Sequence, residues 1–167
     1  DGGAPKSNTV QITAGAKGNW SKELNNPQPN TVYEVDNGSV YRTDNQGRVT
    51  KVEANLNLTT ADRNTYRQCK AGKCGARGDE GGHLIASIFN GPGEALNLVP
   101  MDANLNKGVW KKMENEWAAA LKEGKQVNVT IQPVYEGAGK KPESFVVRYS
   151  IDSAQPKSRN LKNRPGG

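Results

Sequence analysis

The residue best suited to acid–base chemistry is His83, the single histidine of the chain, which follows Gly81 and Gly82 and begins an apolar run. The ordinary pKa of imidazole lies near physiological pH, so its neutral form can take a proton from water. A lone histidine at such a position is more often structural, but the two glycines permit close approach of a ligand. His83 is therefore a candidate general base, and hydrolysis of a phosphodiester needs such a base together with a cation.

Asn106 and Glu114 offer the oxygen ligands that Mg²⁺ prefers. On one continuous helix their separation corresponds to a rise of roughly 12 Å and to faces about 80° apart, so both cannot easily bind one ion directly. Because helical side chains lean towards the N-terminus, Glu114 could hold a water on an ion bound by Asn106. Alternatively, Asn106 caps the helix and Glu114 pairs with Lys107 or Lys111. The spacing by itself leaves both interpretations open.

The pattern that predicts the helix, from about residue 107 to residue 123, is a set of large apolar residues three or four positions apart. They are Trp110, Met113, Trp117 and Leu121. Asn104 or Asn106 can cap its start, and Gly124 stands where a helix should stop. Tryptophans at helical spacing indicate core packing rather than platforms for stacked bases.

Strands are expected on both sides of this helix. Between residues 31 and 56, apolar and polar residues alternate around the turns DNG and DNQG, which predicts a meander with Val32, Val40, Val49 and Val52 in its core. The run HLIASIF suits a buried strand, and QVNVTIQPVY and SFVVRYSID suit two more, whereas residues 59–82 read as polar and glycine-rich. This order of elements argues for one α+β domain.

The composition fits a domain that meets a polyanion. Lysine and arginine total 23 against 17 acidic residues, a formal charge of +6, which attracts phosphate groups but also suits any basic soluble domain. No segment approaches the roughly 18 to 20 apolar residues needed to span a bilayer. The first residues, DGGAPKSNTV, lack the apolar core of a secretory leader. We therefore expect a mature product or a piece of a longer protein.

Two cysteines, Cys69 and Cys74, lie in the segment CKAGKC. They form a short-loop disulfide, which would suit an exported protein, or remain two thiols, and the sequence favours neither. A zinc site with His83 is less favoured, because structural zinc takes four ligands and the chain has no third cysteine or second histidine.

The segment GDEGGHLIA, followed by NLVPMDANLNKGVWKKMENEW, resembles the DNA/RNA non-specific endonucleases of the ββα-metal (His-Me finger) superfamily. It is most similar to the branch found as C-terminal domains of bacterial polymorphic toxins, over roughly residues 63–151. The resemblance implies an α+β fold in which the strand with His83, a loop and the helix from about 107 to 123 form a ββα-metal finger on a mainly antiparallel sheet. We expect a linker or lead-in segment at 1–30, a nuclease domain at 31–152 and a basic, flexible tail at 153–167.

The order of the motif, a histidine, then N-x-x-P, then N-x-G-x-W-x-x-x-E, implies a role for each matched residue. His83 falls on the general base. Asn106 falls on the direct ligand of a single Mg²⁺, for which Mn²⁺ can substitute, and Glu114 on the acid that holds water on the ion. Asn97 falls on an asparagine that helps to order the site.

The chain departs from its relatives before the histidine, where many carry Asp-Arg-Gly-His. Glu80 is a longer acid in place of the aspartate, and Gly81 replaces an arginine that would contact phosphate. Other cations must supply that charge, and the candidates for substrate binding are Arg77, Arg63, Arg67 and Lys107. Apart from the resemblance, Asp79 and Glu80 are expected to be a solvated acidic pair in a loop.

The resemblance thus implies a Mg²⁺-dependent, largely sequence-non-specific endonuclease that hydrolyses DNA, with RNA as a second candidate, to products with 5′-phosphates. It further implies the toxic domain of a bacterial competition toxin, secreted or delivered into the cytoplasm of a target cell, with an acidic immunity protein as partner. The alternatives are a non-catalytic nucleic-acid-binding module, a protein-interaction domain and an RNA-restricted nuclease of the same fold.

Overall fold

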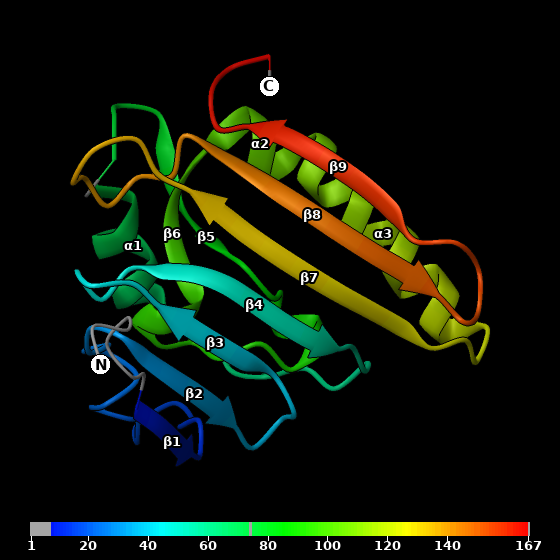
Figure 1. The fold of residues 1–167 in the computed structure, drawn as a ribbon, viewed down its shortest axis with the longest axis horizontal. Coiled ribbons are helices and arrows are strands. Elements are labelled where there is room, and N and C mark those ends of the chain that lie inside the picture. The colour runs from blue at the N-terminus through cyan, green and yellow to red at the C-terminus, as the bar shows by residue number, and fades with distance from the viewer. Residues whose placement is uncertain (1–7, 74, 167) are drawn as a thin grey trace, which may run out of the picture.

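The computed structural model describes residues 8–73 and 75–166. It contains a seven-stranded sheet in the order β1-β2-β3-β4-β7-β8-β9 and a separate two-stranded sheet, β5-β6. The small sheet and α1 lie on the same side of the large sheet (Figure 1). Only β1 and β2 are parallel, and the other neighbours are antiparallel. The large sheet consists of β1 Asn8–Ile12, β2 Thr31–Val35, β3 Val40–Thr43, β4 Val49–Asn55, β7 Val127–Val134, β8 Ser144–Ile151 and β9 Lys157–Lys162. The predicted α+β class is confirmed.

The meander β2-β3-β4 follows the turn chemistry of the sequence. Gly38 and Gly47 both have positive φ, 90° and 78°, which glycine adopts without strain. The Asp44 carboxylate accepts hydrogen bonds from the backbone N–H groups of Gln46 and Arg48, both at 2.9 Å, and so closes the second turn. Of the four valines expected in this core, Val32, Val49 and Val52 are buried, and Val40 is half-buried.

The long helical segment packs its aromatic face on β8. The ring of Trp110 meets Phe145 edge to face at 5.0 Å between centroids, and that of Trp117 meets Tyr149 in the same way at 5.4 Å. Both tryptophans are almost fully buried, which confirms the prediction that they belong to the core. This packing fixes the segment across one face of the sheet (Figure 1).

The boundaries of that segment differ from the prediction. It comprises α2, Ala103–Lys107, and α3, Val109–Lys122, which Gly108 separates with φ −102° and ψ −106°. The cap is neither Asn104 nor Asn106: the Asp102 carboxylate accepts from the Leu105 N–H at 3.0 Å, so both asparagines lie inside the helix. Gly124, at φ 81°, follows the last turn as expected.

Residues 59–82, read from the sequence as polar and irregular, contain the helix α1, Thr65–Lys73. Asn64 caps it, because its side-chain oxygen accepts from the Arg67 N–H at 3.0 Å. The strand at the histidine is β5, Asp79–His83, which pairs with β6, Leu98–Asp102, so His83 ends a strand rather than beginning one. The expected strand HLIASIF is wrong: two short 3-10 turns, η1 Ser87–Phe89 and η2 Ala95–Asn97, lie between β5 and β6.

Helix α1 docks on β5 through backbone rather than through apolar side chains. None of its residues is fully buried. A Cβ added at Gly81 would overlap the Gln68 carbonyl of α1, and one at Gly72 would lie 3.0 Å from the Gly81 nitrogen. Position 81 therefore accepts only glycine while α1 stays in place, which gives a physical reason for the departure from the Asp-Arg-Gly-His pattern.

The segments expected to be a linker at 1–30 and a flexible tail at 153–167 each contribute a strand to the large sheet. Asn8–Ile12 form β1, and Lys157–Lys162 form β9 against β8. Buried Glu94 accepts from the backbone N–H groups of Gly15 at 2.7 Å and Ser21 at 2.9 Å, which ties the segment after β1 to the loop before β6. Local composition misses β1 because its partner β2 lies more than twenty residues further along the chain, and it misses β9 because only Leu161 of that strand is buried.

Cys74 lies outside the described residues. The two alternatives for Cys69 and Cys74, a disulfide or two thiols, therefore both stay predictions. Among the described residues, no helix has the length and apolar character required to cross a membrane.

The contact at Gly81 predicts a specific cost. Gly81→Ala should lower the free energy of unfolding by about 2 kcal/mol, since its methyl group would overlap backbone that cannot rotate away. Gly139→Ala is the matched control, because a Cβ there has no neighbouring heavy atom within 4 Å. Urea denaturation of both variants checks this, and equal midpoints would show that α1 is not held against β5 in this way.

Candidate functional site

The loop that follows His83 is held by one buried amide, that of Asn97. Its oxygen accepts from the Ile85 N–H at 2.9 Å and from the Tyr41 hydroxyl at 2.8 Å. Its nitrogen donates to the carbonyls of Ile85 at 2.7 Å and Pro92 at 2.9 Å. All these groups are buried or nearly buried. Because Tyr41 belongs to β3, the network links the residues just after His83 to the large sheet.

His83, the last residue of β5, is half-buried, and its Nε2 atom has no hydrogen-bond partner among the described residues. Burial, with a smaller contribution from the positive charge of Arg63, lowers its pKa from the ordinary 6.5 to about 4. The imidazole is therefore neutral at physiological pH, and its Nε2 atom is buried without a hydrogen-bond partner among the described residues. The neutral form is the one that a general base requires.

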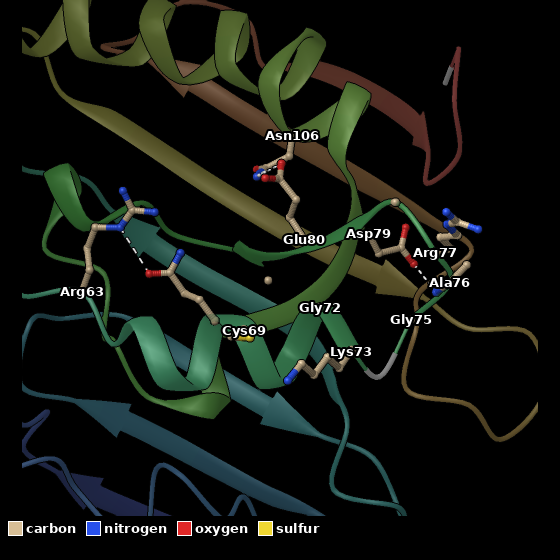
Figure 2. A pocket seen from close by; sticks show the side chains of 13 residues that line it. Arg63, Cys69, Gly72, Lys73, Gly75, Ala76, Arg77, Asp79, Glu80 and Asn106 are labelled. Atoms are coloured by element: carbon tan, nitrogen blue, oxygen red, sulfur yellow. Dashed lines mark hydrogen bonds between the residues drawn. The ribbon is translucent and has the colours of Figure 1, made fainter.

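A cavity of about 560 Å³ opens next to this strand, between α1, the turn at 75–78, β5 and α2 (Figure 2). Its lining combines cations with acid and amide groups: Arg63, Lys73, Arg77, Asp79, Glu80 and Asn106. His83 and Glu114 are not among the described residues that line it. Arg63 connects the cavity to His83, because it lines the cavity and its charge acts on the imidazole.

Asn106 extends from α2 towards Glu80 of β5 (Figure 2). Its Nδ2 donates to the Glu80 carboxylate at 3.4 Å, and Lys107 Nζ lies 3.4 Å from the other oxygen of that carboxylate. The amide nitrogen is thus directed to the acid, which leaves the Asn106 oxygen without a partner among the described hydrogen bonds. Glu80 is consequently not a solvated loop residue, as the sequence suggested, but the link between β5 and α2.

Glu114 lies in α3, beyond the break at Gly108, and is 7% exposed. Burial raises its pKa to about 7, while the nearby Lys111 opposes the shift. The helical-wheel relation between Asn106 and Glu114 assumed an unbroken helix, and the break at Gly108 removes that assumption.

The structure separates the candidate arginines. Arg63 and Arg77 line the 560 Å³ cavity, whereas Arg67, on another face of α1, lines a second cavity of about 550 Å³. None of the three takes part in an ion pair with a described residue. Lys107, the fourth candidate, is paired with Glu80 and still 74% exposed along its side chain.

Two residues support the site in ways that the sequence did not predict. Asp79, expected in a solvated pair, is 2% exposed along its side chain and bridges Lys141 at 2.9 Å and the Ala76 N–H. Asn163, from the end expected to be loose, accepts from the Asp102 N–H at 2.8 Å and donates to the carbonyls of Pro100 and Pro142. It therefore fixes the end of β6 where α2 begins, and such a contact depends entirely on tertiary structure.

Comparison with known proteins agrees with this architecture. Residues 29–153 match the DNA/RNA non-specific endonuclease family, and the chain belongs to that family. It is thus a member of an endonuclease family, whose reaction is the hydrolysis of phosphodiester bonds.

Among individual proteins, the chain is similar to the type VII secretion system protein EssD of Staphylococcus aureus, from strains USA300 and NCTC 8325, at 37% identity over 131 residues. The match covers 74% of this chain and 21% of EssD, so the chain spans about a fifth of the length of these relatives. Its fold is similar to a solved structure of Sda1 nuclease with a bound zinc ion, with a TM-score of 0.57 and 15% identity over 74% of this chain and 75% of the other.

The environment of His83 predicts an unusual titration. Because it is the single histidine, its ring proton signals in an NMR spectrum are unambiguous, and we expect a midpoint near pH 4 in metal-free protein. Arg63→Ala should raise this midpoint, since one lowering charge is removed, and Arg67→Ala, the matched control, should not. A midpoint near 6.5 in the unsubstituted protein would contradict the buried, neutral imidazole.

The lowered pKa of His83 also makes the stability of the fold depend on pH. Between pH 6.5 and about 4 the unfolded chain binds a proton at His83 that the folded chain does not. The contribution of His83 to stability is thus complete above pH 6.5 and is lost as the pH falls towards 4.

Proposed function

We propose that this chain is a metal-dependent endonuclease that cleaves DNA, with RNA as a second substrate, largely without sequence preference and leaving 5′-phosphates. The observation that carries the proposal is the neutral His83 next to a cavity lined by Asn106, Glu80 and two arginines that form no ion pair with a described residue. On this proposal β5, β6 and the α2–α3 segment form the ββα-metal finger.

The donor atoms suit Mg²⁺, with Mn²⁺ as a substitute. Asn106 offers a free amide oxygen beside the Glu80 carboxylate, and both are hard ligands. Mg²⁺ usually keeps several waters, so one or two protein oxygens are enough to hold it. We propose Asn106 as the direct ligand, with Glu114 acting through water. The zinc ion in the Sda1 structure supports a divalent metal in this fold. When bound, the ion would neutralise charge on the phosphate oxygens.

In this proposal the residues of the chain divide the remaining work. His83 takes a proton from the attacking water, and Asn97 holds the loop that follows it. Burial keeps the imidazole neutral, and the charge of Arg63 adds to this effect. Arg63 also lines the cavity, so it replaces the arginine that is absent at Gly81 and contacts the phosphate. Arg77 and Lys107 bind neighbouring phosphates. Such contacts reach the backbone and not base edges, which makes binding salt-sensitive and tolerant of sequence.

The biological setting is proposed from the similarity to EssD, a type VII secretion system protein. We infer that the chain is the toxic domain of a longer bacterial protein, exported and active in the cytoplasm of a target cell. A producing cell must then be protected, and an acidic immunity protein that covers the basic cavity would do so.

The central test is digestion of a plasmid, in parallel with a structured RNA, with Mg²⁺ and with EDTA. Cleavage should require the metal. His83→Ala should lower the rate by at least ~10², the scale of general-base catalysis, and Asn106→Ala should do so with a higher metal requirement. Circular dichroism controls for folding. Near-normal cleavage by folded His83→Ala, or activity unaffected by EDTA, would refute the mechanism, and cleavage of RNA alone would favour the RNA-restricted nuclease.

The role of Arg63 is tested against a neighbour of equal charge. Arg63→Ala should lower kcat by about 10²-fold, the cost of one lost transition-state contact, whereas Arg67→Ala should affect mainly KM because Arg67 lines the other cavity. Both variants lose one positive charge, so general electrostatic attraction changes equally. Equal losses of kcat in the two would exclude Arg63 as the replacement for the missing arginine.

A further inference from the structure

The outward ridge of α1 is formed by Tyr66, Lys70 and Lys73, of which Lys73 also lines the 560 Å³ cavity and Tyr66 has no role in the chemistry described so far. These residues are four and three positions apart, so their side chains share one side of the helix. Tyr66 is 68% exposed, the most of any large hydrophobic side chain in residues 8–73 and 75–166. A single exposed tyrosine is ordinary on a protein surface, so the surroundings of the ring decide whether it has a function.

The charged residues of α1 itself are all cationic. Helix α1 contains no acidic residue. None of its three cations, Arg67, Lys70 and Lys73, forms an ion pair with a described residue. The guanidinium carbon of Arg67 lies 5.6 Å from the centre of the Tyr66 ring, a cation–π contact that restrains the ring. An aromatic side chain among unpaired cations is the combination that binds single-stranded nucleic acid.

The position of the ridge adds a second argument. One side of α1, with Cys69 and Gly72, lines the 560 Å³ cavity of the proposed active site. Another side, with Arg67, Lys70 and Ala71, lines the second cavity of about 550 Å³, which also contains Lys140. The helix therefore lies between two cavities that both carry cations, and a nucleic-acid strand passing from one to the other would cross it.

We infer that the ridge of α1 is a binding site for an unpaired stretch of nucleic acid. One base stacks on Tyr66, and the adjoining phosphates contact Arg67, Lys70 and Lys73. Bases in a duplex are stacked on each other and do not present a free face, so this site favours single-stranded over double-stranded substrate. The inference rests on the proposed nuclease function and narrows its substrate class.

The test measures affinity separately from cleavage. Fluorescence anisotropy with a phosphorothioate-linked, labelled oligonucleotide in EDTA compares single-stranded and duplex forms of one sequence, and a gel confirms that the probe stays intact. Tyr66→Ala and Tyr66→Leu should each weaken single-strand binding about tenfold, the effect of losing one stacked base, and duplex binding less than about twofold. Tyr66→Trp should retain binding. Leu58→Ala, at another exposed apolar residue, is the matched control and should change neither affinity.

A spectroscopic signal tests stacking itself. A 2-aminopurine base in the single strand should be quenched by the wild-type protein and by Tyr66→Trp, and not by Tyr66→Leu. Equal loss of single-strand and duplex affinity, or unchanged affinity in folded Tyr66→Ala and Tyr66→Leu, would overturn the inference. A protein that binds the intact probe as described but cuts neither a plasmid, nor single-stranded DNA, nor RNA with Mg²⁺ would instead refute the nuclease proposal, so the two failures are distinguishable.

Discussion

Helix α1 and strand β5 touch through backbone at Gly81, and much of the site follows from this contact. Because no side chain fits between them, the position at which many relatives carry an arginine is closed to any residue larger than glycine. The helix that occupies the space is itself basic and is flanked by Arg63 and Arg77. Position 81 of β5 therefore carries no positive charge, but α1 and its flanking residues place Arg63, Lys73 and Arg77 around the cavity, which is cationic for that reason.

Burial lowers the pKa of His83 more than any charged neighbour does. Removing the imidazole from water penalises its charged form, and Arg63 adds to that penalty, so the neutral form persists far below neutral pH. A base with a low pKa is a weaker proton acceptor but is always in the correct protonation state. Glu114 shows the same physics with the opposite result: its burial raises the pKa, because the form penalised there is the anion.

Buried amides connect this site to the rest of the fold. Asn97 joins the loop after His83 to β3, and Asn163 joins the end of β6 to the C-terminal segment. Each satisfies several backbone groups that would otherwise be buried without partners, which is costly. The proposed catalytic elements are therefore positioned from both ends of the chain, and β1 and β9 are parts of the sheet that supports them.

The sequence by itself determined the local features. Alternation and turn residues predicted the strands β2, β3, β4, β7 and β8, the tryptophan spacing predicted α3, and the motif around His83 and Asn106 predicted the family. Those signals are local because side-chain periodicity and turn chemistry act over a few residues. Only the tertiary structure decided the helix α1, which lacks an apolar stripe, the strand β1, whose partner is remote, and the strand β9, which buries a single residue. The tertiary structure also placed Arg63 and Arg67 at different cavities, although they are four residues apart in the chain. The cavity that each arginine faces depends on how α1 docks on the rest of the fold.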